Sequence, residues 1–86
     1  MIAHRRDDMT QKADDTLDCG GLYCPMPIVE TAKRIRDLKP GQILEVLSDD
    51  KGICTDMPAW AESTGHEFLG VEEEGGEYRV YVRKKA

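Results

Sequence analysis

Long apolar runs are what this sequence of 86 residues most clearly lacks. No stretch approaches the roughly 20 apolar residues that a membrane-spanning helix needs. The N-terminal stretch carries several charges and no apolar core, which argues against a secretory signal peptide. We therefore expect a cytoplasmic protein with no membrane partner.

Cysteine and histidine are also scarce, with three and two residues respectively. An odd number of cysteines cannot pair completely, so the disulfide framework of a small secreted domain is the wrong template. Neither His4 nor His66 is close to Cys24 in the sequence, which gives little support to a hydrolase built on a cysteine–histidine pair. The spacing of Cys19 and Cys24 lacks a second pair of ligands, so it does not predict a zinc site.

Basic residues are outnumbered, because 12 Lys and Arg against 17 Asp and Glu leave a formal net charge of −5. Proteins that bind nucleic acid normally depend on a clustered excess of Lys and Arg, so we expect no direct nucleic-acid partner. Residues 1–15 are highly charged and have almost nothing apolar to repay the entropy cost of ordering. We predict a mobile tail over residues 1–15 and a single domain over residues 16–86, since so short a chain can bury only one modest core.

From residue 16 onward the sequence shows a regular alternation of strand and helix patterns. The spacing predicts strands over residues 16–19, 42–48, 66–74 and 77–85, and helices over residues 25–38 and from about 55 to 64. The first helix should bury a stripe of apolar residues at intervals of three and four: Ile28, Val29, Ala32, Ile35 and Leu38. Pro58 suits the first turn of the second helix, and the Gly75-Gly76 pair suits a tight hairpin between the last two strands.

The element order β-α-β-α-β-β predicts an α/β (α+β) fold, a two-layer sandwich with a four-stranded mixed sheet. The chain is too short for helices on both faces, so both helices should cover one face. A right-handed crossover through the first helix makes the first two strands parallel, so both helices should begin at the same edge of the sheet. We therefore expect Cys24 and Cys54 at one end of the molecule. Tyr81, Ile43 and Leu47 suggest an apolar surface on the opposite face, which leaves the oligomeric state open.

The most informative stretch is CPMP, at the start of the first predicted helix. Pro25 suits the first helical position because its φ is fixed near the helical value and its missing N–H would be an orphan there; Pro27 is tolerated in the same turn. Cys24 is then the N-cap, where the helix dipole and the free N–H groups of the first turn would lower the pKa of its thiol. Gly20 and Gly21 leave little bulk beside the sulfur. The pattern predicts a nucleophilic Cys24, against the alternative of a small buried residue.

The other two cysteines need separate explanations. Cys19 shares a strand face with Leu17, which favours a buried structural role. Cys54 lies near the start of the second helix, which we expect to begin at Thr55 or Asp56. It is a second sulfur-handling thiol, the partner of a regulatory disulfide, or a helix-entry residue with its side chain packed inward. The sequence leaves these roles open.

The motif LDCGGLYCPMPIVE, followed by LKPGQILEVLSDD and TDMPAWAESTGHEF, resembles the TusA/SirA family of small sulfur-carrier proteins. The hallmark of that family is a Cys-Pro-x-Pro (CPxP) motif that opens the first helix. The resemblance runs from about Leu17 to Lys84 and implies the same β-α-β-α-β-β sandwich. Cys54 is not part of the family hallmark.

The resemblance also implies a function. Cys24 would accept sulfane sulfur as a persulfide from a cysteine desulfurase or a rhodanese-like donor. It would then pass the sulfur to an acceptor protein in a sulfur relay that serves tRNA thiolation, cofactor sulfuration or sulfur oxidation. No metal or organic cofactor is implied.

Three functions from different classes agree with the sequence. The first is the sulfur carrier, a sulfurtransferase-like protein that turns over only within a relay, so whether it counts as an enzyme depends on convention. The second is a thiol redox switch in which Cys24 pairs with Cys54 or Cys19. The third is a non-catalytic binding or regulatory module. The sequence does not identify the sulfur donor, the acceptor or the final pathway.

Overall fold

The structure is a computed structural model that describes residues 13–23 and 25–85. Its elements, in chain order, are β1 (Asp15–Asp18), α2 (Met26–Ile35), β2 (Ile43–Ser48), α3 (Ile53–Thr64), β3 (Glu67–Glu74) and β4 (Glu77–Arg83). The predicted order β-α-β-α-β-β is confirmed. The backbone N–H of Asp14 donates to the carbonyl of Ile43 at 2.8 Å, so pairing begins two residues before the predicted domain start. Residues 1–12 of the predicted tail lie outside the described residues.

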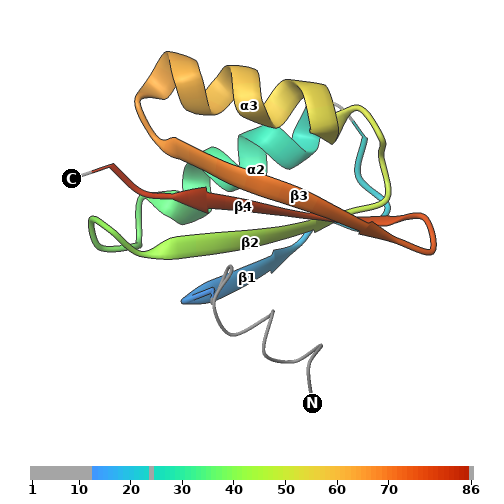
Figure 1. Ribbon diagram of the computed structural model, residues 1–86, viewed down its shortest axis with the longest axis horizontal. Coiled ribbons are helices and arrows are strands. Elements are labelled where there is room, and N and C mark those ends of the chain that lie inside the picture. The colour runs from blue at the N-terminus through green and yellow to red at the C-terminus, as the bar shows by residue number, and fades with distance from the viewer. Residues whose placement is uncertain (1–12, 24, 86) are drawn as a thin grey trace.

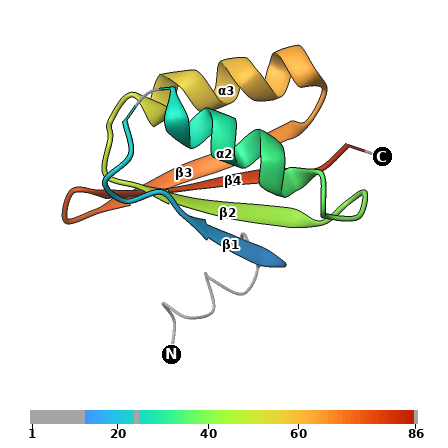
Figure 2. The same cartoon turned by 180° about the vertical axis from the view of Figure 1, so that it is seen from behind.

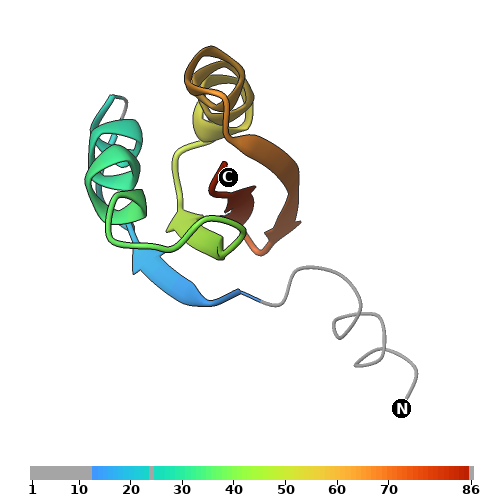
Figure 3. The ribbon, with the colours of Figure 1, turned by 90° about the vertical axis from the view of Figure 1, so that its left-hand side faces the viewer.

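The strands form one mixed sheet in the order β1-β2-β4-β3. β1 and β2 are parallel, whereas β4 runs antiparallel to both β2 and β3. Figure 3 shows α2 and α3 next to each other on one face of the sheet, as predicted. Because β1 and β2 are parallel, both helices begin at the same end of the sheet, where the turn between β3 and β4 also lies (Figure 1).

The hydrophobic core lies between this sheet and the two helices. Leu44 and Val46 of β2 point inward, and each is 0% exposed. They lie opposite Val82 and Val80 of β4, so the inward side chains of the two central strands pair directly. The buried helix residues that pack in this core cluster include Ile35 of α2 and Ile53 and Met57 of α3. The packed layers hold the ends of β1 and β2, from which the loops toward α2 and α3 leave.

The buried face of α2 differs from the predicted apolar stripe. Val29 is exposed, and the fully buried positions of the helix are Pro27, Thr31 and Ile35. Thr31 is polar, but its hydroxyl donates a hydrogen bond of 2.7 Å to the carbonyl of Pro27, which allows the side chain to be buried. Ile28, Ile35 and Leu38 of the predicted stripe do pack in or against the core, so the prediction was wrong at Val29, whose place on the buried face is taken by Pro27 and Thr31.

The start of α3 also differs from the prediction. The helix begins at Ile53, after Gly52 as the N-cap, rather than at Thr55 or Asp56. Asp50 organises this entry, because its Oδ1 accepts the backbone N–H of Gly52 at 3.0 Å. Pro58 consequently lies in the second turn instead of the first. Neither described helix has the length and apolar character that would let it cross a bilayer.

The sheet face without helices carries a polar network. Tyr81 is 5% exposed, and its hydroxyl donates a hydrogen bond of 2.9 Å to Oε2 of Glu45. The hydroxyl of Thr16 donates to Oε1 of the same carboxylate, also at 2.9 Å. Half-buried Ile43 and Leu47 lie on this face beside the network. The apolar surface suggested by the sequence is therefore interrupted by hydrogen-bonded polar groups.

Candidate functional site

The loop from β1 to α2 contains the predicted nucleophile. Cys24 itself lies outside the described residues, while its chain neighbours Tyr23 and Pro25 lie inside them and are both exposed. The loop from β2 to α3 reaches the same end of the molecule, as Figure 2 shows from behind. The candidate site is therefore built by two loops that leave neighbouring parallel strands, β1 and β2.

The start of α2 is one residue later than predicted. The N-cap is Pro25, with φ −99° and ψ 14°, and the helix itself begins at Met26. The carbonyl of Pro25 is the first helical acceptor, because the N–H groups of Ile28 and Val29 both donate to it at 3.1 Å. The N-cap position predicted for Cys24 thus belongs to Pro25, whose ψ lies outside the helical range. Pro27 is inside the first turn, as predicted.

The backbone N–H groups in the first turn of α2 already donate hydrogen bonds within the protein. The N–H of Met26 donates to the carbonyl of Tyr23 at 2.8 Å, Pro27 has no N–H, and the next two N–H groups bond to the N-cap carbonyl. An anion at this end would therefore be favoured by the helix dipole rather than by direct bonds from the first turn. The first turn holds no acidic residue that would oppose such an anion.

Asp49 ties the loop of the predicted nucleophile to the end of β2. Both carboxylate oxygens of Asp49 lie 3.3 Å from the backbone N of Gly21. Gly21 has φ +83°, a conformation that strains residues with a side chain. Apart from its chain neighbours, no atom of the described residues would lie within 4 Å of a Cβ added at Gly21. The sequence pointed to Gly21 but missed Asp49, although its position directly after a strand parallel to β1 was an available signal.

Cys54 is the second residue of α3. It is a free thiol whose half-buried side chain packs against the hydrophobic core. Burial first, and then negative charge at Glu73, raise the pKa of Tyr78, which also packs against the core. α3 starts at the same end of the sheet as α2 (Figure 1). The part that Cys54 plays in sulfur chemistry stays a prediction.

Cys19 has the buried position that the sequence predicted. Its side chain is 0% exposed. Burial, followed by the negative charges of Glu30 and Asp18, raises the pKa of its thiol. A thiol that is enclosed and kept neutral is a poor nucleophile. Cys19 therefore belongs to the core and not to a reactive site.

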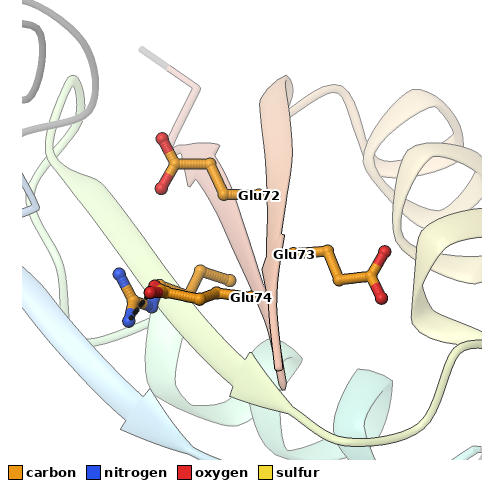
Figure 4. A pocket seen from close by; sticks show the side chains of 4 residues that line it. Glu72, Glu73 and Glu74 are labelled. Atoms are coloured by element: carbon orange, nitrogen blue, oxygen red, sulfur yellow. Dashed lines mark hydrogen bonds and ion pairs between the residues drawn. The ribbon is translucent and has the colours of Figure 1, made fainter. Parts of the chain in front are cut away.

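An open hollow of about 460 Å³ lies on the β3–β4 hairpin, and its walls are Glu72, Glu73, Glu74 and Arg79. In Figure 4 the side chains of Glu72 and Glu74 point to one side of the strand and Glu73 to the other. Arg79 lies 3.4 Å from Glu74. Within residues 13–23 and 25–85, no group of three or more His, Cys, Asp or Glu is arranged to hold a metal ion.

Comparison with known proteins gives a family match across the fold. Residues 15–84 match the family model described as Sulfurtransferase TusA. The match begins at β1 and ends just after β4, and it includes the whole CPMP stretch.

Individual relatives agree with this match. YrkF of Bacillus subtilis is 56% identical over 73 residues, which are 85% of this chain but 40% of YrkF. YrkI of the same organism is 47% identical and is covered to 97%. Sulfur carrier protein TusA of Pseudomonas aeruginosa is 40% identical over 78 residues, or 91% of this chain and 99% of that protein. The crystal structure of a SirA-like protein from Desulfitobacterium hafniense superimposes with a TM-score of 0.73 at 25% identity, covering 84% of this chain and 99% of the other.

Proposed function

Because this chain belongs to the TusA family of sulfurtransferases, we propose that it carries sulfane sulfur as a persulfide on Cys24 within a sulfur relay. One observation carries the proposal: the family match runs through the CPMP stretch, of which the described residues Pro25, Met26 and Pro27 form the start of α2, with Pro25 and Met26 exposed. Cys19 is buried, which removes one competing thiol.

The transfer is an exchange between sulfur atoms. The thiolate of Cys24 attacks the outer sulfur of a persulfide on the donor; the new S–S bond forms as the donor's S–S bond breaks, and the donor leaves as a thiolate. An acceptor thiolate then attacks the outer sulfur on Cys24 in the same way. No net electrons are exchanged, because the sulfane sulfur keeps its oxidation state in both steps. The dipole of α2 favours the anionic thiolate and persulfide at this end.

The partners are those that membership of the TusA family implies. The donor is a cysteine desulfurase or a rhodanese-like protein, and the acceptor is a relay protein with a reactive thiol. The relay serves tRNA thiolation, cofactor sulfuration or sulfur oxidation, and we expect it to operate in the cytoplasm. The carrier itself needs no metal or organic cofactor for these two exchanges.

A thiol switch that joins Cys24 to Cys54 is the second candidate. It is favoured by the start of α3 at the same end of the sheet as α2 (Figure 1) and by the free thiol at Cys54. The switch would use the same Cys24 thiol without carrying sulfur.

A labelled relay tests the carrier function. A cysteine desulfurase is supplied with cysteine that contains radioactive sulfur, and the chain is then separated under non-reducing conditions. We expect label on the wild-type chain, loss of the label on addition of a thiol reductant, and no label on Cys24→Ser. Equal labelling of Cys24→Ser would reject Cys24 as the carrier.

A further inference from the structure

The loop between β1 and α2 contains two consecutive turns, each closed by a backbone hydrogen bond. The N–H of Leu22 donates to the carbonyl of Cys19 at 3.1 Å, and the N–H of Met26 donates to the carbonyl of Tyr23 at 2.8 Å. We call them the 19–22 turn and the 23–26 turn. In the sequence, Cys24 falls between the two residues that close the 23–26 turn. Both bonds are local, so they do not by themselves fix the loop relative to the sheet.

A hydrogen bond joins the 19–22 turn to the loop that follows β2, and Figure 2 shows both loops at the same end of the molecule. The backbone N–H of Gly21 donates to the carboxylate of Asp49, with 3.3 Å from the nitrogen to each oxygen. The next side chain, Leu22, packs against the core, whereas Tyr23 is 67% exposed. The bond from Asp49 therefore lies where the loop is last packed before Cys24.

Asp49 is itself held in place by its neighbours in the chain. Ser48 is 2% exposed and pairs with Tyr78 of β4. The N–H of Asp50 donates to Oγ of Ser48 at 3.0 Å, and Oδ1 of Asp50 accepts the N–H of Gly52 at the entry to α3. Because the backbone on both sides of Asp49 is already ordered, its carboxylate bonds to the loop at little further cost in entropy.

We propose that Asp49 is a positioning residue for sulfur transfer, and that it acts through the N–H of Gly21 to fix where the loop presents Cys24. The inference rests on the proposed function. Each exchange requires the attacking, transferred and leaving sulfur atoms to be aligned, so a loop that wanders lowers the rate even where the thiol of Cys24 is reactive. Asp49 supplies a hydrogen-bond acceptor and takes no part in the chemical step.

A transfer assay with a cysteine desulfurase and cysteine tests this role. Asp49→Ala removes the acceptor, and we expect the maximal rate to fall about tenfold, with a change of less than about twofold in the chain concentration for half-maximal transfer. Asp49→Asn keeps an acceptor oxygen and should recover most of the rate. Loss of packing alone would not be rescued in this way.

Asp50→Ala is the matched control. It removes the neighbouring carboxylate, which bonds to the N–H of Gly52 instead of to the loop that contains Cys24. It should keep the wild-type maximal rate. The proposal is overturned if Asp49→Ala reaches the wild-type maximal rate, if Asp49→Asn is as slow as Asp49→Ala, or if Asp50→Ala is equally slow.

Amide hydrogen exchange separates the positioning role from the proposed function, because it needs no sulfur donor. We expect Asp49→Ala to speed exchange at Gly21 and Leu22 about tenfold, and Asp50→Ala to leave both amides unchanged. If the wild-type chain carries no sulfur, the proposed function falls and the exchange rates still decide whether Asp49 holds the loop. Unchanged exchange at both amides in Asp49→Ala contradicts the positioning role.

Discussion

The backbone N–H of Gly21 points at the carboxylate of Asp49, and the nitrogen lies 3.3 Å from each of its two oxygens. The two residues belong to different loops, one leaving β1 and the other leaving β2. Because the acceptor is charged, this hydrogen bond is stronger than one to a neutral acceptor would be. Through it, the packed sheet holds the loop that contains Cys24, three residues after Gly21.

Gly21→Ala should impair both stability and sulfur transfer. An alanine at φ +83° costs about 1 kcal/mol, and relief of that strain would shift the loop away from Asp49. We expect transfer to fall by roughly tenfold, measured alongside urea unfolding.

Gly41→Ala is the control for this variant. Gly41 has φ +90° and, as at Gly21, an added Cβ would meet no atom of the described residues within 4 Å apart from its chain neighbours. It lies in the turn between α2 and β2, at the opposite end of the sheet (Figure 1). It should lose similar stability and keep full transfer. Equal transfer by the two variants would show that the Gly21 loop has no positioning role.

Cys54 should be the preferred disulfide partner of Cys24 under mild oxidation. Diamide takes two electrons and two protons from the thiol pair, and Cys19 is too deeply buried to compete. We expect an intramolecular disulfide in the wild-type chain and in Cys19→Ser, but not in Cys54→Ser, detected by mass spectrometry after alkylation of the remaining thiols. Slow crosslinking without a preferred pair would argue against a role for Cys54 beside Cys24.

Tyr81→Phe should destabilise the sheet. The substitution removes the hydroxyl that donates to Glu45, at a site where burial and this hydrogen bond raise the pKa of Tyr81. We expect a loss of about 1 to 2 kcal/mol in the free energy of unfolding, measured by urea denaturation. Tyr23→Phe, which removes a hydroxyl from a residue that is 67% exposed, should change little. Equal losses in both variants would contradict the importance of the Glu45 network.

We expect protonation of His66 to lower the stability of the fold in acid. Burial first, and then the positive charges of Lys85 and Lys84, lower the pKa of His66 below 6.5. The fold thus favours neutral imidazole, whose Nδ1 accepts the N–H of Lys85 at 3.1 Å. This contribution is present above pH 6.5 and is lost as the pH falls through the lowered pKa.

The comparison for His66 is His66→Asn, which keeps an acceptor but does not titrate. Urea unfolding from about pH 8 to about pH 5 should show the wild-type chain losing more stability than the variant at the acid end. Parallel curves, or a wild-type gain in acid, would contradict the assigned sign.

The order of helices and strands could be predicted from the sequence because each element has a strong local pattern. Alternation in the strands placed Leu17 and Cys19 inward, and both are buried. The turn at Gly75-Gly76 was also predicted from the sequence, and both glycines have positive φ in the structure. These signals depend only on neighbouring residues, so they needed no knowledge of the packing.

The details of the site depended on hydrogen bonds and backbone angles that the apolar pattern does not encode. The apolar pattern predicted Val29 as a core residue, but Val29 is exposed. Thr31 is buried instead, because its hydroxyl donates a hydrogen bond within the helix. The tie between Asp49 and Gly21 joins residues 28 positions apart. The start of α2 moved by one residue because Pro25 adopts ψ 14°.

The most direct test of the account is where a transferred sulfur atom resides. Wild-type chain, Cys24→Ser, Cys54→Ser and Cys19→Ser are each incubated with a persulfide donor, and intact mass is followed by peptide mapping. The account predicts a gain of one sulfur atom on the peptide that contains Cys24, retained in Cys54→Ser and Cys19→Ser and missing from Cys24→Ser. A sulfur atom that maps to Cys54 or Cys19, or that persists in Cys24→Ser, would contradict it.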